Sequence, residues 1–132
     1  MKLIHKYISF FVLMVVSTMV SAQGWTMVNG DTLFISVCEH DGGFIYDNGG
    51  PNGNYINNFD GWVVITAPSG VNITLSGDYA TENCCDKINV WDGNIATGTH
   101  LVEAGGEGSI NVVATSGRMT IQFHSDGSVN NS

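Results

Sequence analysis

The segment Arg118–His124, RMTIQFH, alternates apolar and polar side chains along its whole length. Met119, Ile121 and Phe123 lie on one face of an extended chain, and the polar residues between them lie on the other. This period of two predicts a β-strand with one buried face. Helical periodicity is absent from the sequence that follows residue 22, so we predict an all-β fold.

Other strands are predicted on both sides of this segment in the same way. Short apolar or alternating runs, separated by turns rich in Gly, Asn, Asp and Pro, are typical of a β-sandwich or a barrel. The Asn29-Gly30-Asp31 turn predicts a weaker hairpin between Trp25–Val28 and Thr32–Val37. The clearest of the other strands are Trp62–Thr66, Ile73–Leu75, Lys87–Trp91 and Ser109–Ala114.

The N-terminal segment has the pattern of a secretory signal peptide. Lys2 and Lys6 form a basic region, Ile8–Val20 is almost wholly apolar, and Val20-Ser21-Ala22 is a small-residue cleavage pattern. The apolar run is shorter than the ~20 residues of a membrane span. We therefore expect residues 1–22 to be removed, which leaves 110 residues of a secreted protein without a membrane anchor.

The predicted mature chain is strongly acidic. It has two basic residues, Lys87 and Arg118, and twelve acidic ones, a net charge of −10. Such a surface repels nucleic acid and anionic lipid, and it attracts cations and basic partners. Export also predicts an oxidising environment, in which cysteines form disulfides.

Catalytic and zinc motifs are not recognisable. Cys84 and Cys85 are adjacent, without the Cys-x(2–4)-Cys spacing of a zinc site. The run His124-Ser125-Asp126 cannot easily form a catalytic triad, because neighbouring side chains of a strand point to opposite faces. We expect a non-catalytic protein and keep a small secreted hydrolase as the third alternative.

Three acidic residues are candidates for a calcium site. Glu82, Asp86 and Asp126 lie at borders between turns and strands, among Asn, Ser and Gly residues whose oxygens could assist. Calcium takes six to eight oxygen ligands, which need not be close in sequence. The alternative is that these are ordinary solvated acids in turns.

Four motifs in order resemble a CUB domain, and together they cover Cys38–Ser132. They are GGFIYDNGGPNGNYINN, WVVITAPSGVNITLSGDY, TENCCDKINVWDG and SGRMTIQFHSDGSVNNS. The resemblance implies an antiparallel two-sheet jelly-roll β-sandwich over residues 38–132, with residues 23–37 as an N-terminal lead-in strand or hairpin. It also implies an extracellular binding module without catalytic activity.

The resemblance further implies a calcium site and a kind of partner. The family's motif residues correspond to Glu82, Asp86 and Asp126 as calcium ligands, with Tyr55 in support. Ser128 and the carbonyl of Gly127 are further candidate ligands, and Asp78 could substitute for Glu82, because the Glu82–Asp86 gap is shorter than in animal calcium-binding members. The partner would be an extracellular protein with an exposed Lys or Arg, or a glycan. An ion-free structural or accessory module of a larger secreted protein is the second alternative.

Two features depart from the family pattern. Gly61 and the segment His100–Gly105 lack cysteines that the family often has, so Cys38 is expected to pair with Cys84 or Cys85. A bond between the two adjacent cysteines is less favoured, because the ring strains the intervening peptide. The family usually continues into a final strand, whereas this sequence stops at Asn130-Asn131-Ser132, so either it is truncated or a sheet edge is left open to pairing with another chain.

Overall fold

The computed structural model describes residues 23–39 and 42–128, and it is all-β, as predicted. The predicted signal peptide, residues 1–22, and the C-terminal residues 129–132 lie outside the described part. No helix in residues 23–39 and 42–128 is long and apolar enough to cross a membrane. The elements are β1 (Gln23–Thr26), β2 (Thr32–Ser36), β3 (Gly43–Tyr46), a 3₁₀ turn (Gly50–Asn52), β4 (Asp60–Thr66), β5 (Ile73–Ala80), β6 (Lys87–Asp92), β7 (Thr99–Ala104), β8 (Glu107–Ala114) and β9 (Arg118–His124).

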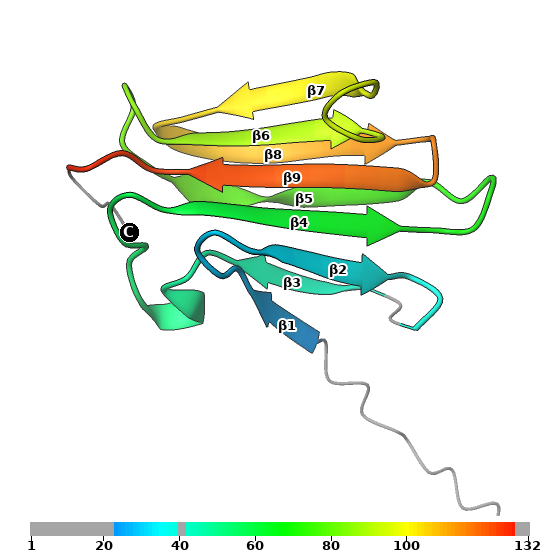
Figure 1. The fold of residues 1–132 in the computed structure, drawn as a ribbon, viewed down its shortest axis with the longest axis horizontal. Helices are drawn as coiled ribbons and strands as arrows, with labels where there is room; N and C mark the ends of the chain where they lie inside the picture. The colour runs from blue at the N-terminus through cyan, green and yellow to red at the C-terminus, as the bar shows by residue number, and fades with distance from the viewer. Residues whose placement is uncertain (1–22, 40–41, 129–132) are drawn as a thin grey trace, which may run out of the picture.

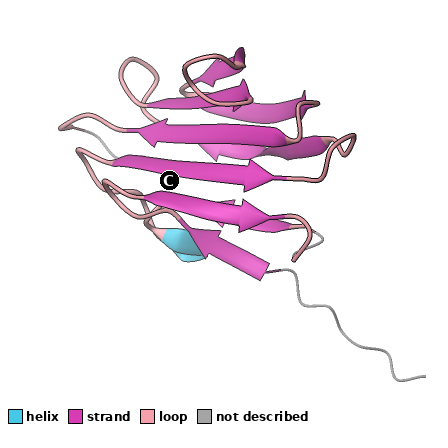
Figure 2. Ribbon diagram, turned by 45° about the vertical axis from the view of Figure 1, so that its right-hand side comes forward, coloured by secondary structure: helices cyan, strands magenta, loops and turns pink. Residues whose placement is uncertain are grey.

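The strands form two layers (Figure 1). One layer is a five-stranded sheet in the order β2-β4-β9-β6-β7. The other layer consists of two separate ribbons, β1-β3 and β5-β8, and it covers the inner face of the large sheet (Figure 2). This arrangement agrees with the predicted β-sandwich. The layer formed by the two ribbons is divided between β3 and β5.

The strand pairing is only partly antiparallel, and the predicted N-terminal hairpin is wrong. β1 pairs with β3 and β2 pairs with β4, and both pairs are parallel. The turn at Gly30, with φ of 72°, therefore carries the chain from one layer to the other instead of closing a hairpin. The predicted turn is present, but the strands on either side of it pair with strands farther along the chain.

The central strand β9 organises the core. It runs antiparallel to both β4 and β6, so its apolar face lies in the middle of the large sheet. Met119, Ile121 and Phe123 are buried there, as their alternation predicted. Gly61, opposite Phe123 in β4, allows the Phe59 ring to approach, because a Cβ atom at residue 61 would lie 2.5 Å from that ring.

Several boundaries differ from the prediction, and two strands were not predicted. β9 is as expected, whereas β5 continues to Ala80 and β8 begins at Glu107. The short β3 and the edge strand β7 were missed. In β7, THLVEA lacks regular alternation of apolar and polar residues, and the strand is specified by its pairing with β6.

Asp92 fastens the end of β6 to the turn between β8 and β9. Its carboxylate accepts hydrogen bonds from the backbone N–H groups of Thr115 and Ser116, at 2.9 and 3.0 Å. Hydrogen bonds from the Ser116 side chain and then from these N–H groups lower the pKa of Asp92 to about 2. The folded protein therefore favours the ionised form of this side chain.

This lowered pKa predicts a loss of stability in acid. The stabilisation from Asp92 is present above the ordinary pKa of 3.8 and is lost as the pH falls from about 4 to about 2. We expect Asp92→Asn to be less stable than the parent protein at pH 6, and the difference to shrink below pH 4. Urea unfolding at pH 6, 4 and 2.5 measures this. A difference that does not change with pH would contradict the assignment.

Candidate metal centre

Three strand ends place the candidate site at one end of the sandwich. β4 begins at Asp60 and β6 begins at Lys87, and both residues pair with His124, the last residue of β9. Because β9 lies between β4 and β6, the segments before these two strands meet the segment after β9. Residues 55–59, 82–86 and 125–128 are thereby brought together from positions up to about 70 residues apart in the sequence.

Three predicted ligands form one cluster. Glu82, Asp86 and Asp126 each offer a carboxylate oxygen, and these three oxygens lie within 4.8 Å of one another. Three negative charges at this separation repel one another, and a cation among them would remove the repulsion. The cluster consists of oxygen donors, which are the ligands that calcium prefers.

Asp86 is the buried member, with a relative exposure of 0%. Its Oδ2 accepts a hydrogen bond of 2.6 Å from the Tyr55 hydroxyl, and its Oδ1 accepts one of 2.9 Å from the backbone N–H of Asp126. A fully buried carboxylate requires such donors, since transfer out of water is costly. Asp86 therefore ties the loop before β4 to the turn after β9.

Glu82 is the member whose hydrogen bonding is incomplete. Its Oε2 is buried and has no hydrogen-bond partner among the described residues. Its Oε1 lies 3.3 Å from Cys84 Sγ, but this sulfur is in a disulfide and has no proton to donate. The pKa of Glu82 is raised, mainly because burial removes surrounding water and to a smaller extent because the negative charges of Asp126 and Asp86 repel its own. Proton donors or a bound cation would stabilise the charge of this carboxylate.

The turn after β9 holds Asp126 in place. Asp126 Oδ1 accepts hydrogen bonds from the backbone N–H of Ser128, at 2.8 Å, and from the Ser128 hydroxyl, at 3.2 Å. The carbonyl of Gly127 accepts one from the Asn57 side chain, at 3.2 Å. Gly127 and Ser128 are both exposed, so each retains an oxygen that a cation could use.

Ser125 and Asn57 contribute to the site and were not predicted. Ser125 is buried, its hydroxyl donates to the carbonyl of Ile56 at 2.7 Å, and it accepts from the N–H of Phe59 at 3.0 Å. Asn57 Oδ1 is buried without a partner among the described residues, next to the same turn. Nothing in the sequence near Ser125 indicates that a loop some 66 residues away packs against it.

Tyr55 and Asp78, the two supporting candidates, have different positions. Tyr55 is buried, and its hydroxyl contacts Asp86 and accepts from the N–H of Glu82 at 3.1 Å, so it lies where a supporting residue would be needed. Asp78 is exposed on β5 and is not part of the carboxylate cluster. Its proposed substitution for Glu82 is therefore not supported by its position.

The cysteine pairing differs from the prediction. Cys84 is bonded to Cys85, and Cys38 is free and exposed. Cys38 follows β2, at the end of the sandwich where β4 ends, whereas the adjacent cysteines precede β6, at the end where β4 begins. The seven residues of β4 separate these ends by about 20 Å, far beyond the reach of a disulfide.

The chain matches no protein-family model, and no curated protein is significantly similar to it.

Proposed function

We propose that this protein is a secreted, non-catalytic binding module of the CUB type, with a jelly-roll sandwich stabilised by one calcium ion. The ion would be held by Glu82, Asp86 and Asp126, with Ser128 and the Gly127 carbonyl as further ligands. Its partner would be an extracellular protein with an exposed Lys or Arg, or a glycan. A net charge of −10 on residues 23–132 favours a basic partner.

The observation that carries the proposal is the Glu82 carboxylate. It offers an oxygen within 4.8 Å of oxygens of two other carboxylates, and its buried Oε2 has no hydrogen-bond partner among the described residues. Within residues 23–39 and 42–128 no basic side chain forms an ion pair with it, and Lys87, the nearest basic residue in sequence, donates to the carbonyl of Asn83 instead. A divalent cation bound by oxygen would satisfy all three acids at once.

The alternative is an ion-free structural module, and one observation favours it. Both oxygens of Asp86 already have hydrogen-bond donors, so the most buried acid is stable without an ion. In that case Asp86 joins two loops and Glu82 remains a partly exposed acid. A secreted hydrolase is less favoured, because Asp86 and Asp126 are already held by hydrogen bonds within the protein.

Calcium is expected to stabilise the protein in a saturable way. Extracellular calcium modules commonly bind with dissociation constants of about 10⁻⁴–10⁻³ M. At ten times the dissociation constant, the gain in the free energy of unfolding is about 1.4 kcal/mol. We expect EDTA to lower the melting temperature and millimolar calcium to restore it, as measured by differential scanning calorimetry.

Matched variants separate the site from a general effect of ionic strength. Asp126→Asn should abolish the calcium-dependent rise, because it removes one of the three charges while retaining the size of the side chain. Glu103→Gln, an exposed acid on β7, should leave the rise unchanged. Identical melting curves in EDTA and in calcium would favour the ion-free module.

A further inference from the structure

The outer face of the five-stranded sheet carries a row of aromatic rings. In Figure 1 this sheet lies in front of β5 and β8, and the two ribbons pack on its opposite, inner face. Core residues of β4, β6 and β9 alternate with residues that point outward, so Trp62, Trp91 and Thr120 lie on the outer face. His100 of β7 pairs with Trp91 and lies on the same face.

The two tryptophan rings lie over the central strand β9. Because β9 separates β4 from β6, the backbones that carry Trp62 and Trp91 are about 10 Å apart. Their ring centroids are only 6.1 Å apart, with 21° between the ring planes, so the rings lean toward each other across β9. Val64 and Thr120, which pair with each other on this face, are only 5% and 4% exposed. The nearly parallel rings therefore cover the sheet, and both remain partly exposed.

Polar groups beside the rings are available to a ligand. His100, whose ring centroid lies 5.1 Å from that of Trp91, donates from Nε2 to Asn89 Oδ1 at 3.0 Å. Gln122 donates from Nε2 to Asp60 Oδ1 at 2.9 Å. Within residues 23–39 and 42–128, the Asn89 amide nitrogen and the Gln122 carbonyl oxygen have no hydrogen-bond partner, and neither atom is buried. The rings are thus flanked by a free donor and a free acceptor.

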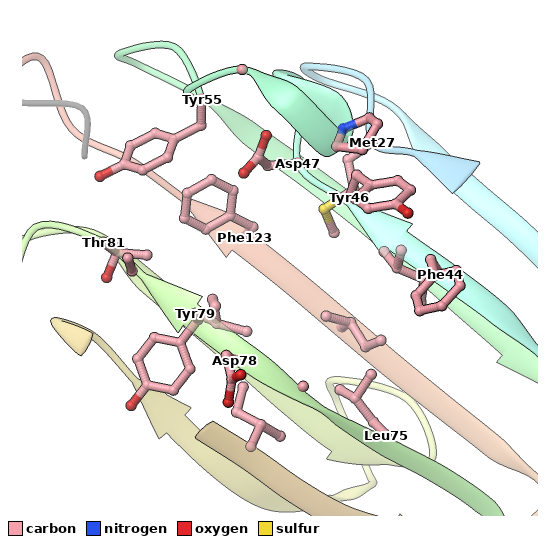
Figure 3. A pocket seen from close by; sticks show the side chains of 18 of the residues that line it. Met27, Phe44, Tyr46, Asp47, Tyr55, Leu75, Asp78, Tyr79, Thr81 and Phe123 are labelled. Carbon is pink, nitrogen blue, oxygen red and sulfur yellow. The ribbon is translucent and has the colours of Figure 1, made fainter. Parts of the chain in front are cut away.

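The outer face is balanced in charge, unlike the rest of the protein. Lys87 and Arg118 are the only Lys and Arg residues after residue 22, and both alternate with core residues and lie on this face. Asp60 and Glu103 on the same face balance them. The net charge of −10 on residues 23–132 therefore comes from the other ten acids, such as Asp78 on β5 (Figure 3). Those acids attract a basic partner and repel an anionic one, whereas an uncharged ligand matches the outer face.

We propose that the outer face binds a neutral glycan, an extended chain of β-linked hexoses. The flat faces of such sugars consist of C–H groups, which pack on aromatic rings. The centroid separations from Trp62 to Trp91 and from Trp91 to His100 are close to the length of one sugar unit in an extended chain. Hydroxyl groups at the sugar edges would bond to the free groups of Asn89 and Gln122.

This inference deepens the proposed function by naming the partner class of one surface. It rests on the proposed function only in treating the protein as a binding module, and it does not require calcium. The carboxylate cluster lies where β4 and β6 begin, whereas the rings lie on the face of the sheet. The test is therefore carried out in EDTA.

The probe is cellohexaose, an extended oligomer of β-linked glucose. Binding is measured by isothermal titration calorimetry and by tryptophan fluorescence. We expect saturable binding that changes the fluorescence, because the sugar contacts Trp62 and Trp91. Maltohexaose has the same glucose units in a curved, α-linked chain and should bind about tenfold more weakly or less. A hexalysine peptide should leave the fluorescence unchanged.

Three variants locate the site. Trp91→Ala should weaken cellohexaose binding by about tenfold or more, since it removes one aromatic contact. Asn89→Ala should weaken binding by a smaller factor while leaving both indole rings in place. Phe44→Ala removes a ring that is 57% exposed on β3 of the other layer, and it should bind like the parent protein (Figure 3). Thermal unfolding confirms that each variant is folded, and Asn89→Ala tests the site even if loss of Trp91 prevents folding.

Three results would overturn the proposal. The first is the absence of saturable cellohexaose binding to the parent protein, and the second is unchanged affinity in the folded Asn89→Ala and Trp91→Ala proteins. The third is a dimer of the free protein that Trp91→Ala converts to a monomer, because the face would then bind a second copy of this chain. The calcium dependence of the melting temperature tests the proposed metal site separately, so glycan binding without a calcium response would support this inference alone.

Discussion

Asp86→Ala is expected to lose the calcium response and to lower the free energy of unfolding by about 2–4 kcal/mol, even in EDTA. The substitution removes the acceptor of two hydrogen bonds, from the Tyr55 hydroxyl and from the Asp126 N–H. Each buried donor left without its acceptor costs about 1–3 kcal/mol. Relief of the repulsion among the three acids offsets part of this loss.

Asp86→Asn separates the two effects. The amide retains one acceptor oxygen, so one of the two hydrogen bonds survives, while the charge needed for the cation is lost. We expect about half the destabilisation of Asp86→Ala, with no calcium response. Urea unfolding in EDTA and in millimolar calcium measures both quantities. If Asp86→Ala were as stable as the parent protein in EDTA, the buried hydrogen bonds would not be holding the two loops together.

Phe59→Ala is expected to lower the free energy of unfolding by about 3–5 kcal/mol, the usual cost of removing a large buried ring. Phe59 has a relative exposure of 0%, and its ring centroid lies 5.5 Å from that of Phe123. Its ring also occupies the space beside Gly61, so truncation leaves a cavity in the centre of the core. A domain of this size is stable by only about 5–15 kcal/mol, so the loss is a large fraction of the total.

The matched control is Phe34→Ala on the outer edge strand β2. Phe34 is 73% exposed, and its removal should change stability by about 0.5 kcal/mol or less. Thermal unfolding of the two variants gives the comparison. Equal effects of the two substitutions would contradict the assignment of Phe59 to the core.

Phe59 also connects the core to the candidate site. Its N–H donates to the Ser125 hydroxyl, and its carbonyl accepts from the Ser125 N–H at 2.9 Å. Asn58, with φ of 56°, directs its own N–H to the carbonyl of Asp126. Asn tolerates this left-handed conformation better than most residues. The position of Asp126 therefore depends on the packing of the Phe59 ring.

The sequence by itself determined most of the strands, all except β3 and β7, and the buried face of the central strand β9. In β9 the alternation of Met119, Ile121 and Phe123 with polar residues was sufficient, because the two faces of a strand meet different surroundings. The acids of the candidate site were also identified from the sequence, since Glu82, Asp86 and Asp126 all lie next to strand ends. These are local properties, and they can be recognised within a few residues.

Only the tertiary structure decided which strands pair, which cysteines bond and which residues complete the site. β1 and β2 flank a good turn but pair with β3 and β4, because burial in two different layers outweighs a short hairpin. Cys38 lies at the opposite end of β4 from Cys84, so distance excludes the predicted bond. Ser125 owes its role to a loop far away in the sequence. Such choices depend on non-local contacts, whose free energy arises only when distant segments pack together.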